Sequence, residues 1–200
     1  MYEQVIEAYL SALEDLKRSG GDVSRTASVS SIFVSRIDVA VDKRLDRLGE
    51  KAVAGRLRGK AAIANAKLAY VRYQERFSGS RWQSLAELGA RTQRLLWAST
   101  STKSPTYKDT MYVEALIGRD TVDTIPPATM DAFRDHGTAP CDTVERDVAG
   151  APHALKDPDR LGLTPNDVTD ELGAAGVPQC ATAFPEPLGH VGRPPPPSPA

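Results

Sequence analysis

The stretch Arg94–Met130, RLLWASTSTKSPTYKDTMYVEALIGRDTVDTIPPATM, decides the fold class of this chain. It contains two short apolar runs, LLWA and TVDTI, with a Ser/Thr-rich loop around Lys103 after the first run and a segment of helical character between the two. Polar residues at the C-terminal end of a buried strand, followed by a helix, are the repeating unit of a β/α enzyme. Because crossovers of this kind join parallel strands, the stretch predicts an α/β fold with a parallel sheet.

Outside this stretch, the pattern adds one more strand and several helices. The segment TASVSSIFVSR, residues Thr26–Arg36, is short and β-branched, so we expect three parallel strands in all, near residues 28–35, 94–98 and 121–125. Apolar residues at three- and four-residue steps predict the helices Tyr2–Arg18, one from about Asp38, Gly59–Phe77, Arg81–Gly89, about Lys108 to Ile117, and Pro127–His136.

The helices are predicted to be amphipathic. In the first, one stripe is apolar and is expected to pack inward: Tyr2, Val5, Ile6, Tyr9, Leu13 and Leu16. In the helix from Asp38, the charged residues are expected to face solvent: Asp42, Lys43, Arg44, Asp46 and Arg47. Lys60 and Lys67 lie on a charged helix face, where a lysine is usually solvated rather than catalytic.

Composition narrows the functional classes. Lys+Arg 25 against Asp+Glu 26 gives a net charge of −1, which argues against a nucleic-acid-binding or membrane-surface protein. Cys141 and Cys180 match neither a disulfide framework nor a metal-ligand spacing, so we expect free thiols in a reducing compartment and no metal. No apolar run is long enough to span a bilayer. The expectation is a soluble, cytoplasmic protein.

The C-terminal part gives a weaker pattern. Thr143–Leu161 has helical character interrupted by prolines, and Thr164-Pro165 is a good start for a helix reaching about Ala175. Beyond this, proline and glycine dominate as far as VGRPPPPSPA. We therefore expect one β/α domain over residues 1–177 and a Pro-rich, disordered tail over residues 178–200.

From chemistry alone, Arg36, Ser99 and Lys103 are the candidates for a binding site. They follow predicted strands, where barrels place their ligand-binding residues. A guanidinium, an ammonium and small hydroxyl donors near a helix N-terminus make a cradle for an anion. The alternative is a polar loop with one surface lysine and an arginine in an ordinary ion pair, and the residues by themselves leave both open.

Three motifs resemble transaldolases, specifically the longer bacterial branch, over about Tyr2 to Val177. SSIFVSR is similar to the sixth-strand motif S-x-F-x-x-R, LWASTSTK to the seventh strand, and TVDTIP to the eighth. The resemblance implies strands six to eight of a (β/α)8 TIM barrel and thus the C-terminal part of such an enzyme. It also implies phosphate-binding roles for the residues that match the motifs: Ser31, Phe33, Arg36, Ser99 and Lys103.

Transaldolases transfer a three-carbon ketol unit between sugar phosphates, in the pentose phosphate pathway, through a lysine Schiff base and without a cofactor. Resemblance therefore implies substrates of the fructose 6-phosphate and sedoheptulose 7-phosphate class. The Schiff-base lysine of that family belongs to an I-K-I-P-A-T strand, and no such segment occurs in the 200 residues. We expect no catalysis by this chain alone, because the covalent route needs that amine.

Three hypotheses follow from the sequence. The chain is a transaldolase that acts when another polypeptide completes the barrel, or a non-catalytic sugar-phosphate-binding remnant of that family. The third is an unrelated interaction protein whose working part is the polyproline run PPPPSP.

Overall fold

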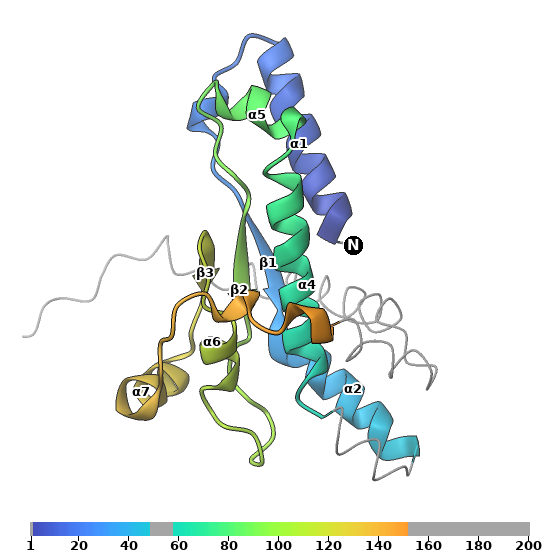
Figure 1. Cartoon of the computed structure of the whole chain (residues 1–200), viewed down its shortest axis with the longest axis vertical. Coiled ribbons are helices and arrows are strands. Elements are labelled where there is room, and N and C mark those ends of the chain that lie inside the picture. Colours follow the sequence, from blue (N-terminus) through green and yellow to red (C-terminus); the bar gives the residue numbers. More distant parts are fainter. Residues whose placement is uncertain (1, 49–57, 152–200) are drawn as a thin grey trace, which may run out of the picture.

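The computed structural model describes residues 2–48 and 58–151. Three strands alternate with helices in this part of the chain (Figure 1). In chain order, with three short 3-10 turns, the elements are α1 Tyr2–Arg18, η1 Val23–Arg25, β1 Val29–Phe33, α2 Val34–Leu48, α4 Ala61–Arg76, α5 Ser80–Ala86, β2 Arg94–Ala98, α6 Met111–Ala115, β3 Thr121–Asp123, α7 Pro127–His136, η2 Thr143–Glu145 and η3 Val148–Gly150.

The strands form one parallel sheet in the order β1-β2-β3. Phe33 pairs with Ala98 across β1 and β2, and Trp97 pairs with Asp123 across β2 and β3. The prediction of an α/β fold with three parallel strands is confirmed. An open three-stranded parallel sheet with helical crossovers is also consistent with part of a (β/α)8 barrel.

Helices cover one face of this sheet. Leu95 and Trp97 of β2 are 0% and 1% exposed and pack in one core with Ala66 and Tyr70 of α4. The indole Nε1 of Trp97 donates to the carbonyl of Leu116, at 2.9 Å, which fastens the end of α6 to the sheet. On the opposite face Val29 and Phe33 of β1 are 42% and 41% exposed, and Leu96 of β2 is half-buried.

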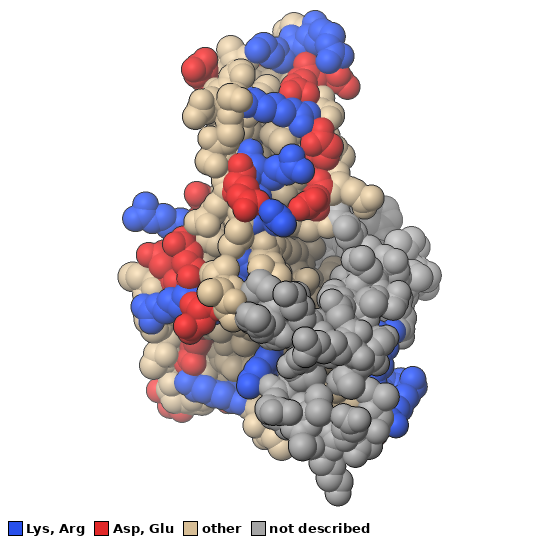
Figure 2. All heavy atoms as spheres, turned by 45° about the vertical axis from the view of Figure 1, so that its right-hand side comes forward, with Lys and Arg blue, Asp and Glu red and all other residues tan. Residues whose placement is uncertain are grey.

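A second core lies at the other end of α4, where α1 and α5 pack together (Figure 1). Its buried members are Ile6, Tyr9, Leu10, Leu13, Val23, Trp82 and Leu85. Arg81 of α5 reinforces it, because its guanidinium forms ion pairs with Glu7 and Glu14 of α1, both at 2.7 Å. Figure 2 shows such acidic and basic side chains intermixed over the visible described surface.

Several predicted boundaries need correction. The strand expected at 28–35 ends at Phe33, and Val34 already begins α2, so Ser35 and Arg36 belong to the first helical turn. The strand at 121–125 ends at Asp123, and the helix expected from Lys108 to Ile117 covers only Met111–Ala115.

The expected stripe of α1 is wrong at one position. Val5 is 40% exposed, whereas Leu10 takes a place in the core at 2%. At the far end of the described chain, the predicted helical character after Thr143 is realised as the short turns η2 and η3. The helix expected after Thr164, the division at residues 177 and 178, the Pro-rich tail and Cys180 lie outside the described residues.

Candidate functional site

The candidate site lies at the C-terminal edge of the sheet. There, two backbone hydrogen bonds continue the ladder beyond the strands: Ser35 N donates to the carbonyl of Ser99, and Thr124 N donates to that of Trp97, each at 3.1 Å. The first bond places the N-terminal turn of α2 directly against the residue that follows β2. Residues far apart in the sequence thus meet at one edge, as expected of parallel strands.

Arg36 and Phe33 form a pair at this edge. The guanidinium carbon of Arg36 lies 4.4 Å from the centroid of the Phe33 ring, which is within the range of a cation–π interaction. Phe33 is 41% exposed, so the pair lies at the accessible face. Because Arg36 stands in the first turn of α2, its positive charge adds to the positive end of the helix dipole.

Ser31 and Ser99 complete the group on the two strands. Ser31 is exposed, and it lies two residues before Phe33 on β1, so both side chains leave the same face of the sheet. Ser99 adopts a left-handed conformation with φ 57°, which non-glycine residues adopt rarely. This turns the chain sharply out of β2 and into the lysine loop, residues 99–110.

Lys103 lies further along the lysine loop. Its side chain is exposed, and Nζ donates to Ser101 Oγ at 2.7 Å. The structure therefore brings Phe33, Arg36 and Ser99 to the C-terminal edge of the sheet, while Ser31 lies two residues further back on β1, paired with Leu96. Lys103 lies in the neighbouring loop.

Asp38 and Asp42 of α2 were not predicted as site residues, but both bind neighbouring segments of the chain through hydrogen bonds. Asp38 is 1% exposed, and its carboxylate accepts from the backbone N of Ala62, at 2.9 Å, and from the hydroxyl of Tyr112, at 2.8 Å. Burial raises the pKa of Asp38 to about 6, although both hydrogen bonds favour the charged form. Asp38 thereby caps the first turn of α4, whose N-cap residue makes no side-chain bond.

Asp42, one turn later, was expected on the solvated face, and this is wrong. It is half-buried and accepts a hydrogen bond from the Tyr107 hydroxyl. The pKa of Asp42 is raised, chiefly by burial. The sequence pattern indicates partial burial of both aspartates, because each directly follows a residue of the buried stripe Ile37, Val41 and Leu45.

A third carboxylate lies at the end of β3. Thr100, which is fully buried, donates from Oγ1 to Asp123 Oδ1 at 2.9 Å. Burial raises the pKa of Asp123 to about 6, and the bond from Thr100 opposes this shift. The pair holds the start of the lysine loop against the neighbouring strand.

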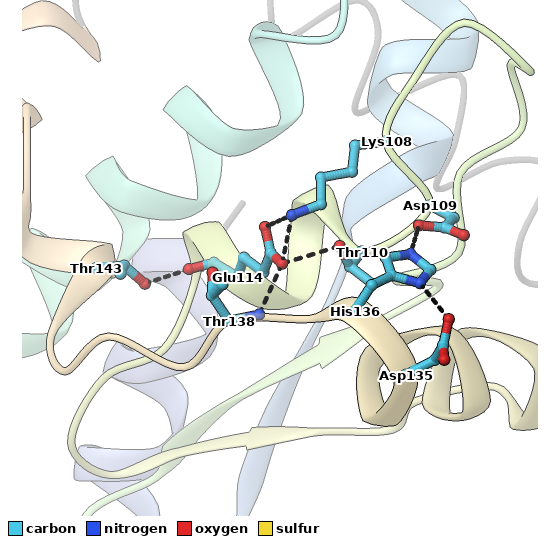
Figure 3. A network of polar contacts seen from close by, with 8 residues as sticks. All are labelled: Lys108, Asp109, Thr110, Glu114, Asp135, His136, Thr138 and Thr143. Carbon is cyan, nitrogen blue, oxygen red and sulfur yellow. Dashed lines mark hydrogen bonds and ion pairs between the residues drawn. The ribbon is translucent and has the colours of Figure 1, made fainter.

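Beyond the loop, a polar network joins α6 to α7 (Figure 3). The Glu114 carboxylate accepts from Lys108 Nζ at 2.7 Å, from Thr110 Oγ1 at 3.0 Å and from the backbone N of Thr138 at 2.9 Å. Nearby, His136 Nε2 lies 2.8 Å from Asp109 Oδ1. These contacts connect the end of α7 to the segment just before α6.

Residues 2–48 and 58–151 contain no group of three or more His, Cys, Asp or Glu residues placed to hold a metal ion. Among the helices of these two ranges, none is both long enough and apolar enough to cross a bilayer. Cys141 is exposed and has no disulfide partner.

Comparison with known proteins gives a consistent result. Residues 1–190 match the family model described as Transaldolase/Fructose-6-phosphate aldolase. Transaldolase of Acidothermus cellulolyticus is 46% identical over 192 residues, covering 96% of this chain and 51% of that protein. Transaldolase of Parafrankia sp. is 49% identical over 177 residues, covering 88% of this chain and 47% of that protein. The chain spans about half the length of the curated relatives it matches.

Proposed function

Because this chain belongs to the transaldolase/fructose-6-phosphate aldolase family, we propose that it binds the phosphate group of a sugar phosphate at the C-terminal edge of its sheet. The substrate class is that of fructose 6-phosphate and sedoheptulose 7-phosphate, and the reaction it serves is transfer of a three-carbon ketol unit. The observation that carries the proposal is the meeting of Arg36 and Ser99 through the bond between Ser35 N and the Ser99 carbonyl.

The charges suit a phosphate dianion. Arg36 offers a planar guanidinium with several donors, and its stacking on Phe33 limits the orientations it can take. Ser31 and Ser99 add hydroxyl donors from the two neighbouring strands, and Lys103 adds a second positive charge from the loop. The first turn of α2 favours negative charge at the same place.

The covalent step requires a neutral lysine amine that is shielded from water and has an acid/base partner. Lys103 is exposed, and Lys67 of α4 already donates from Nζ to the carbonyl of Arg146 at 2.6 Å. Since the I-K-I-P-A-T context is also absent from the 200 residues, we propose that the Schiff base forms on a lysine of another polypeptide segment. The alternative is a sugar-phosphate-binding protein without chemistry.

A borohydride trap with fructose 6-phosphate separates these possibilities. This chain is tested alone and together with the N-terminal half of the Acidothermus cellulolyticus relative, and labelled peptides are located by mass spectrometry. We expect label only on the added fragment. Label on this chain alone would show that one of its own lysines is the nucleophile and would contradict the proposal. No label in either sample, with phosphate binding intact, would favour the non-catalytic alternative.

Binding itself is tested by titration calorimetry with fructose 6-phosphate. Arg36→Ala is expected to weaken binding at least tenfold, or about 1.4 kcal/mol, because a charged donor to the phosphate is lost. Arg119→Ala is the matched control, since Arg119 is exposed and precedes β3 at the opposite edge of the sheet. Equal affinities for the two variants would rule out a phosphate site at Arg36.

A further inference from the structure

The lysine loop is fastened to α2 at two points. At its start, the carbonyl of Ser99 accepts from Ser35 N in the first turn of α2. Near its end, the hydroxyl of Tyr107 donates to Asp42, two turns further along the same helix. Figure 1 shows the loop extending beyond the C-terminal edge of the sheet, on the side where α2 begins.

The loop between these two points is longer than the distance between them along the helix. The two attachment points on α2, Ser35 and Asp42, are seven residue steps apart, which corresponds to about 10 Å along the helix axis. The eight residue-to-residue steps from Ser99 to Tyr107 could span up to about 28 Å if extended. Lys103 is four residues from either attachment, at the middle of this segment in the sequence.

The Tyr107 ring also has a fitted contact. It lies against Gly59: a Cβ atom at this position, as in any other residue, would lie only 3.1 Å from the ring atoms Cε1 and Cζ. Gly59 has a φ of +69°, a left-handed conformation that favours glycine. Tyr107 is half-buried, with its ring against Gly59, just before α4, and its hydroxyl bonded to Asp42 of α2.

The neighbouring contacts strengthen the attachment at both ends. Tyr112 donates to Asp38, one turn before Asp42 on α2, and Thr100 donates to Asp123 at the start of the loop. A single helix thus presents Arg36 at its first turn and holds the far end of the loop by its next two turns.

We propose that Tyr107 and Asp42 are positioning residues, which hold the lysine loop on α2 so that Lys103 and Arg36 act on the same phosphate group. This inference rests on the proposed phosphate site and names two side chains that do not touch the ligand. Loss of the Tyr107 hydroxyl removes the bond that holds the end of the loop on α2. The ammonium group of Lys103 then moves through a larger volume. The charge remains, but its contribution at the site falls.

The test is a double-mutant cycle with inorganic phosphate as the probe, measured by calorimetry at low ionic strength. Tyr107→Phe is expected to weaken phosphate binding three- to tenfold, and Lys103→Ala to weaken it by a similar factor. In the double variant the two losses should not multiply, because Tyr107 acts through Lys103. Tyr70→Phe is the matched control, since its hydroxyl bonds to the Arg119 carbonyl, at 3.1 Å, away from the loop.

The thermal midpoint is measured for every variant, because a purely structural role would lower it and leave the phosphate affinity unchanged. Asp42→Asn gives a second route that leaves the Tyr107 ring in place. If wild type binds phosphate and Arg36→Ala weakens it, but Tyr107→Phe and Asp42→Asn bind as Tyr70→Phe does, the positioning role is wrong and the site stands. If wild type binds no phosphate, both proposals fall.

Discussion

At the scale of single residues, Asp38 has an unusual position for an acidic side chain. It is almost fully buried, and its carboxylate accepts hydrogen bonds from two neutral groups, the Tyr112 hydroxyl and the Ala62 amide. Such a carboxylate caps a helix and fixes a tyrosine, but its charge is costly to bury. The balance between these effects makes the stability of the fold depend on pH.

The sign of this dependence follows from the pKa values. The pKa of Asp38 is about 6 in the folded chain and near 3.9 in an unfolded one, so the folded state binds the proton more tightly. The stabilisation is fully present below about pH 4 and is lost as the pH rises towards 6, by about 3 kcal/mol. Urea unfolding between pH 4 and 7 should show the gap between wild type and Asp38→Asn changing over this window. Parallel curves would contradict the prediction.

At the scale of elements, the end of α7 is tied down by a histidine. His136 is the last residue of the helix, where a positive charge is favourable, and it lies between Asp109 and Asp135 (Figure 3). The pKa of His136 is raised, first by its hydrogen bond to Asp109. The contact therefore stabilises the docked helix fully below the pKa of an unfolded histidine and is lost as the pH rises through the folded value.

An NMR titration of the histidine rings checks this contact. Asp109→Asn should lower the pKa of His136, because the principal acceptor loses its charge. Asp131→Asn, on the exposed side of the same helix, should leave it unchanged. His136→Gln identifies the resonance among the three histidines of the chain. An unchanged titration in Asp109→Asn would show that the two side chains do not interact in solution.

The elements differ in how well the sequence predicts them. α1 and α7 have the bounds that their local patterns predict, because a proline at the first turn and a glycine after the end act within a few residues. The predicted end of β1 was wrong because Val34 favours a strand by its local propensity. The bond of Ser35 N to the Ser99 carbonyl involves a residue 64 positions away, which a local pattern does not reveal. Asp38 and Asp42 were missed for the same reason, since their tyrosine partners are remote in sequence.

At the scale of the whole molecule, the sheet has one face packed against helices and one face accessible. Leu95 and Leu96 are neighbours on β2 and point to opposite faces. Leu95→Ala should cost about 2–4 kcal/mol of unfolding free energy, because Leu95 is fully buried in the core. Leu96→Ala, which truncates a half-buried side chain, should cost no more than about half as much. Denaturant unfolding of both variants measures the difference, and equal losses would mean that both faces are covered.

The separation into two cores also has a spectroscopic consequence. The chain contains two tryptophans, and each lies in a different core: Trp97 in the sheet, 1% exposed, and Trp82 between α1 and α5, 7% exposed. Replacing either one by phenylalanine leaves a single tryptophan, whose emission under selective excitation reports on one core alone. Tyr2 and Phe77 pack against both cores and so connect them. If this connection makes the two cores unfold together, the two tryptophan emission changes will occur at the same denaturant concentration.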